Sequence, residues 1–216
     1  MAATTDRRAA TARSTVYVQD PPIARALFSD VRFSWIWLVI RLYLGYQWIE
    51  ASMHKITSAA WMVNGTGLKG FLSGAVAVPT TAGAKAAITY DWYRGFLQGI
   101  IDSGAYVWMA KVVALGEMAV GIGLIIGAFV GVAAFFGAFM NMNFMLAGSA
   151  STNPVLFAIA GLLILAWKTA GYWGVDRFLL PALGTPWYRG SALEHSEGAE
   201  NVGHPVGQQA TPHDAR

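Results

Sequence analysis

Long apolar stretches alternate with short polar or glycine-rich breaks along most of the chain. The first stretch has tryptophans near both ends and about 20 residues, enough to span a bilayer core. The stretch 105–148 contains two charges, Lys111 and Glu117, and as a single helix it would measure about 65 Å, so we expect it to fold back near 127–131. A last stretch begins at Pro154, a favourable first-turn residue. The pattern predicts four transmembrane helices, over 33–52, 105–126, 130–148 and 154–172.

The remaining segments are more polar. Residues 53–104 contain glycines, Pro79 and two short amphipathic pieces, and we expect a long loop outside the cytoplasm. The tails 1–32 and 181–216 are expected to be disordered, with a short interfacial helix near Ile23–Phe28. The fold predicted for 33–180 is all-α, an up-down bundle of four helices in the membrane.

Composition narrows the function classes. The chain is 55% hydrophobic and 12% charged, against about 25% charged in a typical soluble domain. It has no cysteine, which excludes disulfides, iron–sulfur clusters and thiolate zinc. His54 is the one histidine near the apolar stretches, so two histidine ligands for a haem are not available. The phosphate-binding loops of nucleotide enzymes are also missing.

Basic residues indicate an orientation. The N-terminal tail carries five arginines, whereas the longer loop 53–104 carries four basic residues. Lysine and arginine concentrate on the cytoplasmic side of membrane proteins. We expect a multi-pass protein of the cytoplasmic membrane, with both termini in the cytoplasm and no secretory signal. The small net charge of +3 does not point to nucleic acid.

Four charges fall inside the predicted spans: Arg41, Glu50, Lys111 and Glu117. Charges at this depth are costly unless they are paired or hydrated. Residue counts in an antiparallel hairpin predict two ion pairs, Arg41–Glu117 and Glu50–Lys111. The pairs could simply join the helices, which is the reading we give to Glu50–Lys111. Arg41 and Glu117 are also candidates for catalysis, because reduction of a quinone takes up protons that a buried carboxylate can relay.

Two neutral side chains extend this candidate quinone site, Trp48 and Asn141. Asn141 could donate a hydrogen bond to a quinone carbonyl, or it could bond between helices. Gly123, Gly127 and Gly131 recur at every fourth position, which indicates close backbone packing or a turn.

Three segments resemble a known family. RLYLGYQWIEASMHK at 41–55 resembles the first-helix signature of the DoxX/DoxD family, and GEMAVGIGLIIGAFVGVAAFFG at 116–137 resembles its second signature. WYRGFLQ at 92–98 is similar to the branch that includes the large subunit of thiosulfate:quinone oxidoreductase. The chain departs from the family at 128–131, where many members have a basic residue. The positions that match are Arg41, Gly45, Trp48, Lys55, Trp92, Gly116 and Glu117.

The resemblance implies a membrane subunit that oxidises thiosulfate to tetrathionate and passes electrons to quinone. Quinone would be the electron acceptor, with no metal, haem or flavin expected in this chain. A thiosulfate dianion would need cations at the outer surface, for which the candidates are Lys55, Arg94 and His54, with Trp92 anchoring the loop.

An alternative is a non-catalytic anchor that recruits soluble redox enzymes; a transporter is a third hypothesis. The expected partners are membrane lipids and either a second small subunit or a soluble redox enzyme, with a homo-oligomer as a further alternative.

Overall fold

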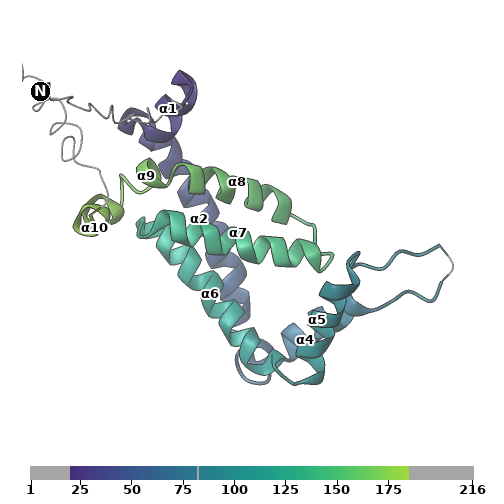
Figure 1. Ribbon diagram of the computed structural model, residues 1–216. Helices are drawn as coiled ribbons and strands as arrows, with labels where there is room; N and C mark the ends of the chain where they lie inside the picture. Colours follow the sequence, from purple (N-terminus) through teal and green to yellow (C-terminus); the bar gives the residue numbers. More distant parts are fainter. Residues whose placement is uncertain (1–19, 82, 185–216) are drawn as a thin grey trace, which may run out of the picture.

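The computed structural model describes residues 20–81 and 83–184, and all regular structure within them is helical (Figure 1). The predicted all-α class is therefore confirmed. The helices are α1 (Pro22–Ser29), η1 (Val31–Phe33), α2 (Ser34–Ile56), α3 (Ala59–Met62), α4 (Thr66–Val76), α5 (Asp91–Asp102), α6 (Tyr106–Ile126), α7 (Val130–Leu146), α8 (Asn153–Leu165), α9 (Trp167–Ala170) and α10 (Asp176–Ala182).

Four of these helices form the main body. Helix α2 packs along α6, α8 packs along α7, and a tight turn at 127–129 joins α6 to α7 (Figure 1). Gly127 and Phe129 both have positive φ in this turn, so the chain reverses within three residues. The helix expected over 154–172 is interrupted at Ala166, which separates α8 from α9.

By length and apolar composition, one described helix is suited to crossing a membrane: α6, with 21 residues. Helices α7 and α8 are apolar but shorter, with 17 and 13 residues. Helix α2 has 23 residues but contains several charged side chains. The four-helix membrane bundle therefore stays a prediction.

The structure corrects the expected tails where it describes them. Two residues of the segment 20–32 contact α2. The carbonyl of Leu27 accepts a hydrogen bond from Trp37 Nε1 at 2.8 Å, and the ring of Phe28 stacks on Trp37. Helix α1 coincides with the short helix expected near Ile23–Phe28. The contacts hold it against α2, which corrects the disorder expected for the rest of this part of the tail. At the other end, α10 includes residues 181 and 182. The predicted disorder of 1–19 and 185–216 lies outside the described residues.

The expected loop 53–104 is largely helical. Helix α4 packs on the first half of α6 and α5 packs on α4, so that the two form a separate lobe at that end of the molecule (Figure 1). The buried core of this lobe includes Leu68, Leu72, Tyr93, Leu97, Ile100 and Ala110. Tyr93 Oη donates to the backbone and side-chain oxygens of Asn143, at 3.0 and 3.2 Å, which joins α5 to the end of α7.

Glycines set the register between α2 and α6. A Cβ on Gly121 would lie 2.6 Å from Ile49 Cγ1, and a Cβ on Gly45 would lie 3.1 Å from the Gly121 carbonyl oxygen. The two backbones can approach this closely only because neither residue has a side chain. Further along the same interface between α2 and α6, Ser52 Oγ donates to the carbonyl of Ala114 at 2.8 Å. This crossing decides which charges of the two helices can meet.

Candidate functional site

In the observed packing of α2 against α6, Arg41 lies far from Glu117. Arg41 lies beside Gly127, ten residues after Glu117 on α6, which is about 15 Å along the helix axis. The predicted Arg41–Glu117 pair is therefore wrong. Its premise was that both helices end at equal depth, whereas α2 continues to Ile56 and crosses α6 at Gly45 and Gly121.

Lys55 is the residue that pairs with Glu117. Its Nζ donates to Glu117 Oε2 at 2.7 Å and to the carbonyl of Ala51 at 3.2 Å, because the side chain leans back along its own helix. The Lys55 side chain is 18% exposed, whereas that of Glu117 is 1% exposed. Lys55 Nζ also lies 5.3 Å from the centre of the Trp61 ring. The pair thus connects a partly exposed cation to a fully buried carboxylate.

Several buried polar atoms of α2, α6 and α7 have no hydrogen-bond partner. Among the described residues, Glu117 Oε1, Trp48 Nε1 and both polar atoms of the Asn141 amide are buried and make no hydrogen bond. Such groups are rare in folded proteins and costly, since each loses its hydration without compensation. We call Trp48, Lys55, Glu117 and Asn141 the Glu117 cluster.

Helix packing places the cluster at one depth. A Cβ on Gly137 of α7 would lie 3.0 Å from Trp48 Nε1 and 3.3 Å from Val120 Cγ1, so α2, α6 and α7 converge there. Asn141 is one turn beyond Gly137, and Glu117 is one turn before Val120. Because α6 and α7 are antiparallel, both lie on the same side of this convergence. The cluster offers a ligand two kinds of donor and at least one carboxylate acceptor.

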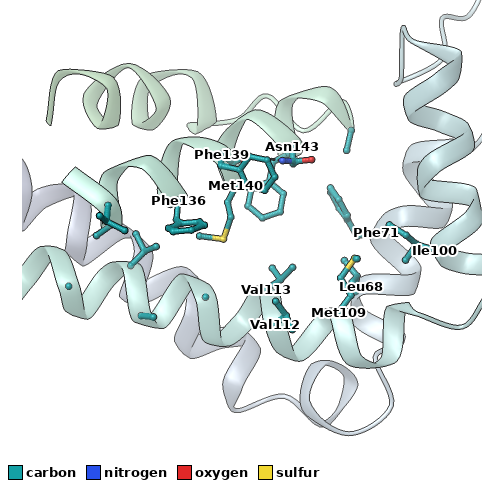
Figure 2. Close-up of a pocket in the computed structure, with 18 of the residues that line it drawn as sticks. Leu68, Phe71, Ile100, Met109, Val112, Val113, Phe136, Phe139, Met140 and Asn143 are labelled. Atoms are coloured by element: carbon teal, nitrogen blue, oxygen red, sulfur yellow. Dashed lines mark hydrogen bonds between the residues drawn. The ribbon is translucent and has the colours of Figure 1, made fainter. Parts of the chain in front are cut away.

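A groove of about 990 Å³ runs along the outer side of the α6–α7 seam (Figure 2). Val112 and Val113 of α6 face Phe136 and Phe139 of α7 across it, and the α4–α5 lobe forms its wide end (Figure 2). Of the described side chains that line it, Tyr93 and Asn143 alone carry oxygen or nitrogen. The groove is therefore suited to hydrocarbon.

Arg41 belongs to a second buried site, near the α6–α7 turn. Its Nη2 donates to the carbonyl of Trp173 at 3.4 Å, and Nη1 lies against the backbones of Gly127 and Gly174. Asp176 is also buried there, and its carboxylate accepts the backbone N–H groups of Phe129 and Val130 at 2.6 and 2.8 Å. We call Arg41, Gly127, Gly174 and Asp176 the Arg41 cluster.

Asp176 acts as a remote cap for α7. The first turn of a helix has backbone N–H groups without intrahelical partners, and Phe129 makes no local side-chain cap. Burial raises the pKa of Asp176, while the N–H groups of Val130 and Phe129 and the nearby Arg41 lower it; the net shift is upward. The described structure thus gives the Arg41 cluster a structural task, the closing of the α6–α7 turn.

The predicted Glu50–Lys111 ion pair is not present. The ion pairs of the described residues are Asp30–Arg32, Lys55–Glu117 and Asp91–Arg94. Glu50 is exposed on α2 and Lys111 is half-buried on α6. Given the Ser52–Ala114 contact, Lys111 is level with the end of α2 rather than with Glu50.

Some of the candidate anion-binding residues already bond to other groups of the protein, and others are exposed. Arg94 pairs with Asp91 at 2.7 Å and also donates to the carbonyl of Ile88 at 2.7 Å, so it holds the start of α5. His54 is exposed, and Trp92 is 68% exposed. Lys55 is engaged by Glu117. The structure brings together Lys55, Trp48, Glu117 and Asn141, but not Arg41 or Arg94.

Sequence reasoning missed Asp176 and the burial of Tyr93. Asp176 follows Gly171 and Gly174, which form a glycine-rich turn directly after an apolar helix. This spacing could have indicated a chain reversal that brings an acidic side chain back to cap another helix. Tyr93 lies within an amphipathic segment, on its apolar face. No three His, Asp or Glu side chains of the described residues gather into a metal-binding group.

Comparison with known proteins leaves the chain's family unassigned. Neither a scan against protein-family models nor searches of curated proteins and solved structures found a match.

Proposed function

We propose that this chain is a multi-pass protein of the cytoplasmic membrane that serves as the membrane subunit of a quinone-linked oxidoreductase. Its electron donor is thiosulfate, which is oxidised to tetrathionate. The observation that carries the proposal is the Glu117 cluster, a buried carboxylate paired with a partly exposed lysine and surrounded by unpartnered donors and acceptors.

The outward faces of the main helices support the membrane assignment. Large apolar side chains cover α6 and α7 on the surface, and a patch of this extent marks contact with lipid or protein. They include Trp108 (57% exposed), Val112 (58%), Leu115 (51%), Val132 (53%), Phe135 (56%), Phe136 (52%) and Phe139 (51%). We interpret this surface as the lipid-facing side of the four-helix bundle.

The chemistry of a quinone matches the free atoms of the cluster. Trp48 Nε1 and Asn141 Nδ2 are donors for a quinone carbonyl, and Glu117 Oε1 is positioned to exchange a proton with the ring oxygen. Two thiosulfate dianions release two electrons as they join into tetrathionate, and the quinone takes up those electrons with two protons. Lys55 offers the route for a proton, or the contact for an anion, from the surface to Glu117.

Quinone reduction in liposomes tests this function. Purified protein reconstituted with a quinone and supplied with thiosulfate is expected to form quinol. The loss of quinone absorbance measures the rate. Glu117→Gln should lower the rate by at least about 100-fold, the usual contribution of a proton-transferring side chain. Glu50→Gln, which changes the same residue type on the exposed face of α2, is the matched control and should retain the wild-type rate. Failure of the wild-type protein to bind quinone would refute the proposal.

An anchor function has one supporting observation. The aromatic rings of Tyr90, Trp92, Tyr93 and Phe96 follow one another at the start of α5, and three of them are more than half exposed. Such a surface suits contact with lipid head groups or with a soluble protein. Normal quinone binding without thiosulfate oxidation, restored by a soluble fraction, would favour this second function.

The orientation has its own test. Ser73 is exposed in α4 and Ser29 is exposed in α1, at opposite ends of the molecule (Figure 1). With both termini in the cytoplasm, Ser73→Cys should react with an impermeant maleimide in intact cells, and Ser29→Cys should react only after lysis. The chain has no native cysteine to interfere. The reverse labelling pattern would mean an inverted orientation.

A further inference from the structure

The groove between α6 and α7 lies directly behind the Glu117 cluster. Gly116 and Val120 of α6 and Met140 of α7 line the groove, while the adjacent residues Glu117 and Asn141 face the bundle interior. The groove and the cluster therefore share one wall. Continuity between them is the first reason to consider both as parts of one binding site.

That wall is thin and contains a flexible side chain. Gly116 has no side chain, and a Cβ placed there would lie 3.8 Å from Met140 Sδ. Met140 is half-buried, and its thioether points between the two helices (Figure 2). An unbranched methionine changes rotamer at low cost, unlike a β-branched residue at the same place. Met140 is therefore the flexible side chain of this wall, next in sequence to Asn141.

The length of the groove suits an extended apolar chain. On α6 it extends from Met109 to Ile126, about 25 Å along the axis. A single hydrocarbon chain fits both the length and the apolar lining.

We infer that the groove holds the isoprenoid tail of the quinone whose head group occupies the Glu117 cluster, and that Met140 is the side chain that admits the head group. This inference rests on the proposed function. It adds a specificity: the site selects quinones by their tail, and short-tailed or tailless quinones bind weakly. Met140 is a positioning residue, because it acts on access and does not touch the reacting atoms.

Filling the groove tests the tail. Ala119 lines the groove and is exposed, so Ala119→Phe should occupy it without disturbing the core. Leu115→Phe is the matched control, one turn away on the exposed face of α6 and outside the groove. Binding of a decyl-tailed benzoquinone and of the same ring without a tail is measured in nanodiscs. The wild type should prefer the tailed quinone by about tenfold, the discrimination of a filled apolar pocket.

Ala119→Phe should abolish this preference by weakening the tailed ligand alone, whereas Leu115→Phe should keep it. Met140→Ala should speed association of both quinones by roughly threefold, because binding no longer waits for a side-chain movement. An unchanged tail preference in Ala119→Phe would overturn the inference and leave the proposed function intact. Binding of neither quinone by the wild type would overturn both. Co-purification of phospholipid, lost in Ala119→Phe while quinone binding is unchanged, would assign the groove to an acyl chain instead.

Discussion

The Arg41 cluster and the Glu117 cluster each contain one basic and one acidic side chain, and they differ in how the carboxylate is bonded. In the Arg41 cluster, both oxygens of Asp176 accept backbone N–H groups, and two glycine backbones press against the guanidinium. In the Glu117 cluster, one carboxylate oxygen is paired, and its neighbours Trp48 and Asn141 have free polar atoms next to a groove. Arg41 Nε and Nη1 are also buried without hydrogen-bond partners, so neither a buried charge nor a free donor is a guide to function by itself. The unpaired carboxylate oxygen and the neighbouring groove distinguish the Glu117 cluster.

The largest effect is expected at Gly127. A Cβ there would collide with Arg41 Nη1, and the residue has a φ of +72°. Gly127→Ala should therefore lower the free energy of unfolding by about 3 kcal/mol or more, from strain and displacement of Arg41. Chemical unfolding in detergent measures the loss. Gly70→Ala, with no atom within 4 Å of the new Cβ, should be neutral or slightly stabilising. Equal losses in the two variants would mean that the Arg41 cluster is not tightly enclosed.

A double-mutant cycle separates the two clusters. Glu117→Gln should cost about 3 kcal/mol, because Lys55 is left without its counter-charge. Combined with Lys55→Met, the two losses should be non-additive by about 1–3 kcal/mol. Combined with Arg41→Gln, they should add within about 0.5 kcal/mol, since the residues are far apart. Strong coupling between Arg41 and Glu117 would contradict the observed register.

The capping role of Asp176 predicts a pH dependence. Its pKa is raised in the folded protein above the unfolded value of 3.8, so the folded state binds its proton more tightly. The contribution of Asp176 to stability is thus largest at low pH and falls as the pH rises from 3.8 to the folded pKa. Subtracting the unfolding free energy of Asp176→Asn from that of the wild type should show this decline. Weaker capping should also cost the variant about 1 kcal/mol. A difference that rises with pH would contradict the direction of the shift.

The smallest expected effect concerns the hydrogen bond between Ser52 and Ala114, which helps to fix the register of α2 on α6. Ser52→Ala removes a buried hydrogen bond to Ala114 and should cost about 1 kcal/mol. Thr57→Ala removes a similar bond, from Oγ1 to the Met53 carbonyl, but on the exposed end of α2, and should cost less. The thermal midpoints of both variants measure the difference. A larger loss for Thr57→Ala would indicate that the α2–α6 register does not depend on Ser52.

Apolar periodicity predicted the helices better than it predicted their contacts. The expected spans 105–126 and 130–148 differ by at most two residues at either end from α6 and α7, because a long apolar stretch and a glycine turn are local signals. The partner of Glu117 was missed because register depends on two glycines, Gly45 and Gly121, that lie far apart in the sequence. Depth counting assumed equal helix ends and had no information on this crossing.

The sequence predicted most residues of the Glu117 cluster but not how they are arranged. Trp48, Asn141 and Glu117 were expected to act together, and packing places them at one depth. Lys55 was expected at the surface as an anion contact, yet its long side chain reaches back into the bundle. The groove could not be predicted, since it arises from the spread of α6 and α7 beyond their turn and from the α4–α5 lobe at its wide end.

The close crossing of α2 and α6 has a consequence for biosynthesis. The ribosome must add the intervening residues, about 50, before α6 can follow α2, which takes roughly 3–10 s at about 5–20 residues per second. During that interval Ser52 and Lys55 have not yet met Ala114 and Glu117. The newly made α2 is thus a helix with an uncompensated charge. In the membrane topology proposed above, the insertion machinery or water stabilises this charge until α6 is made.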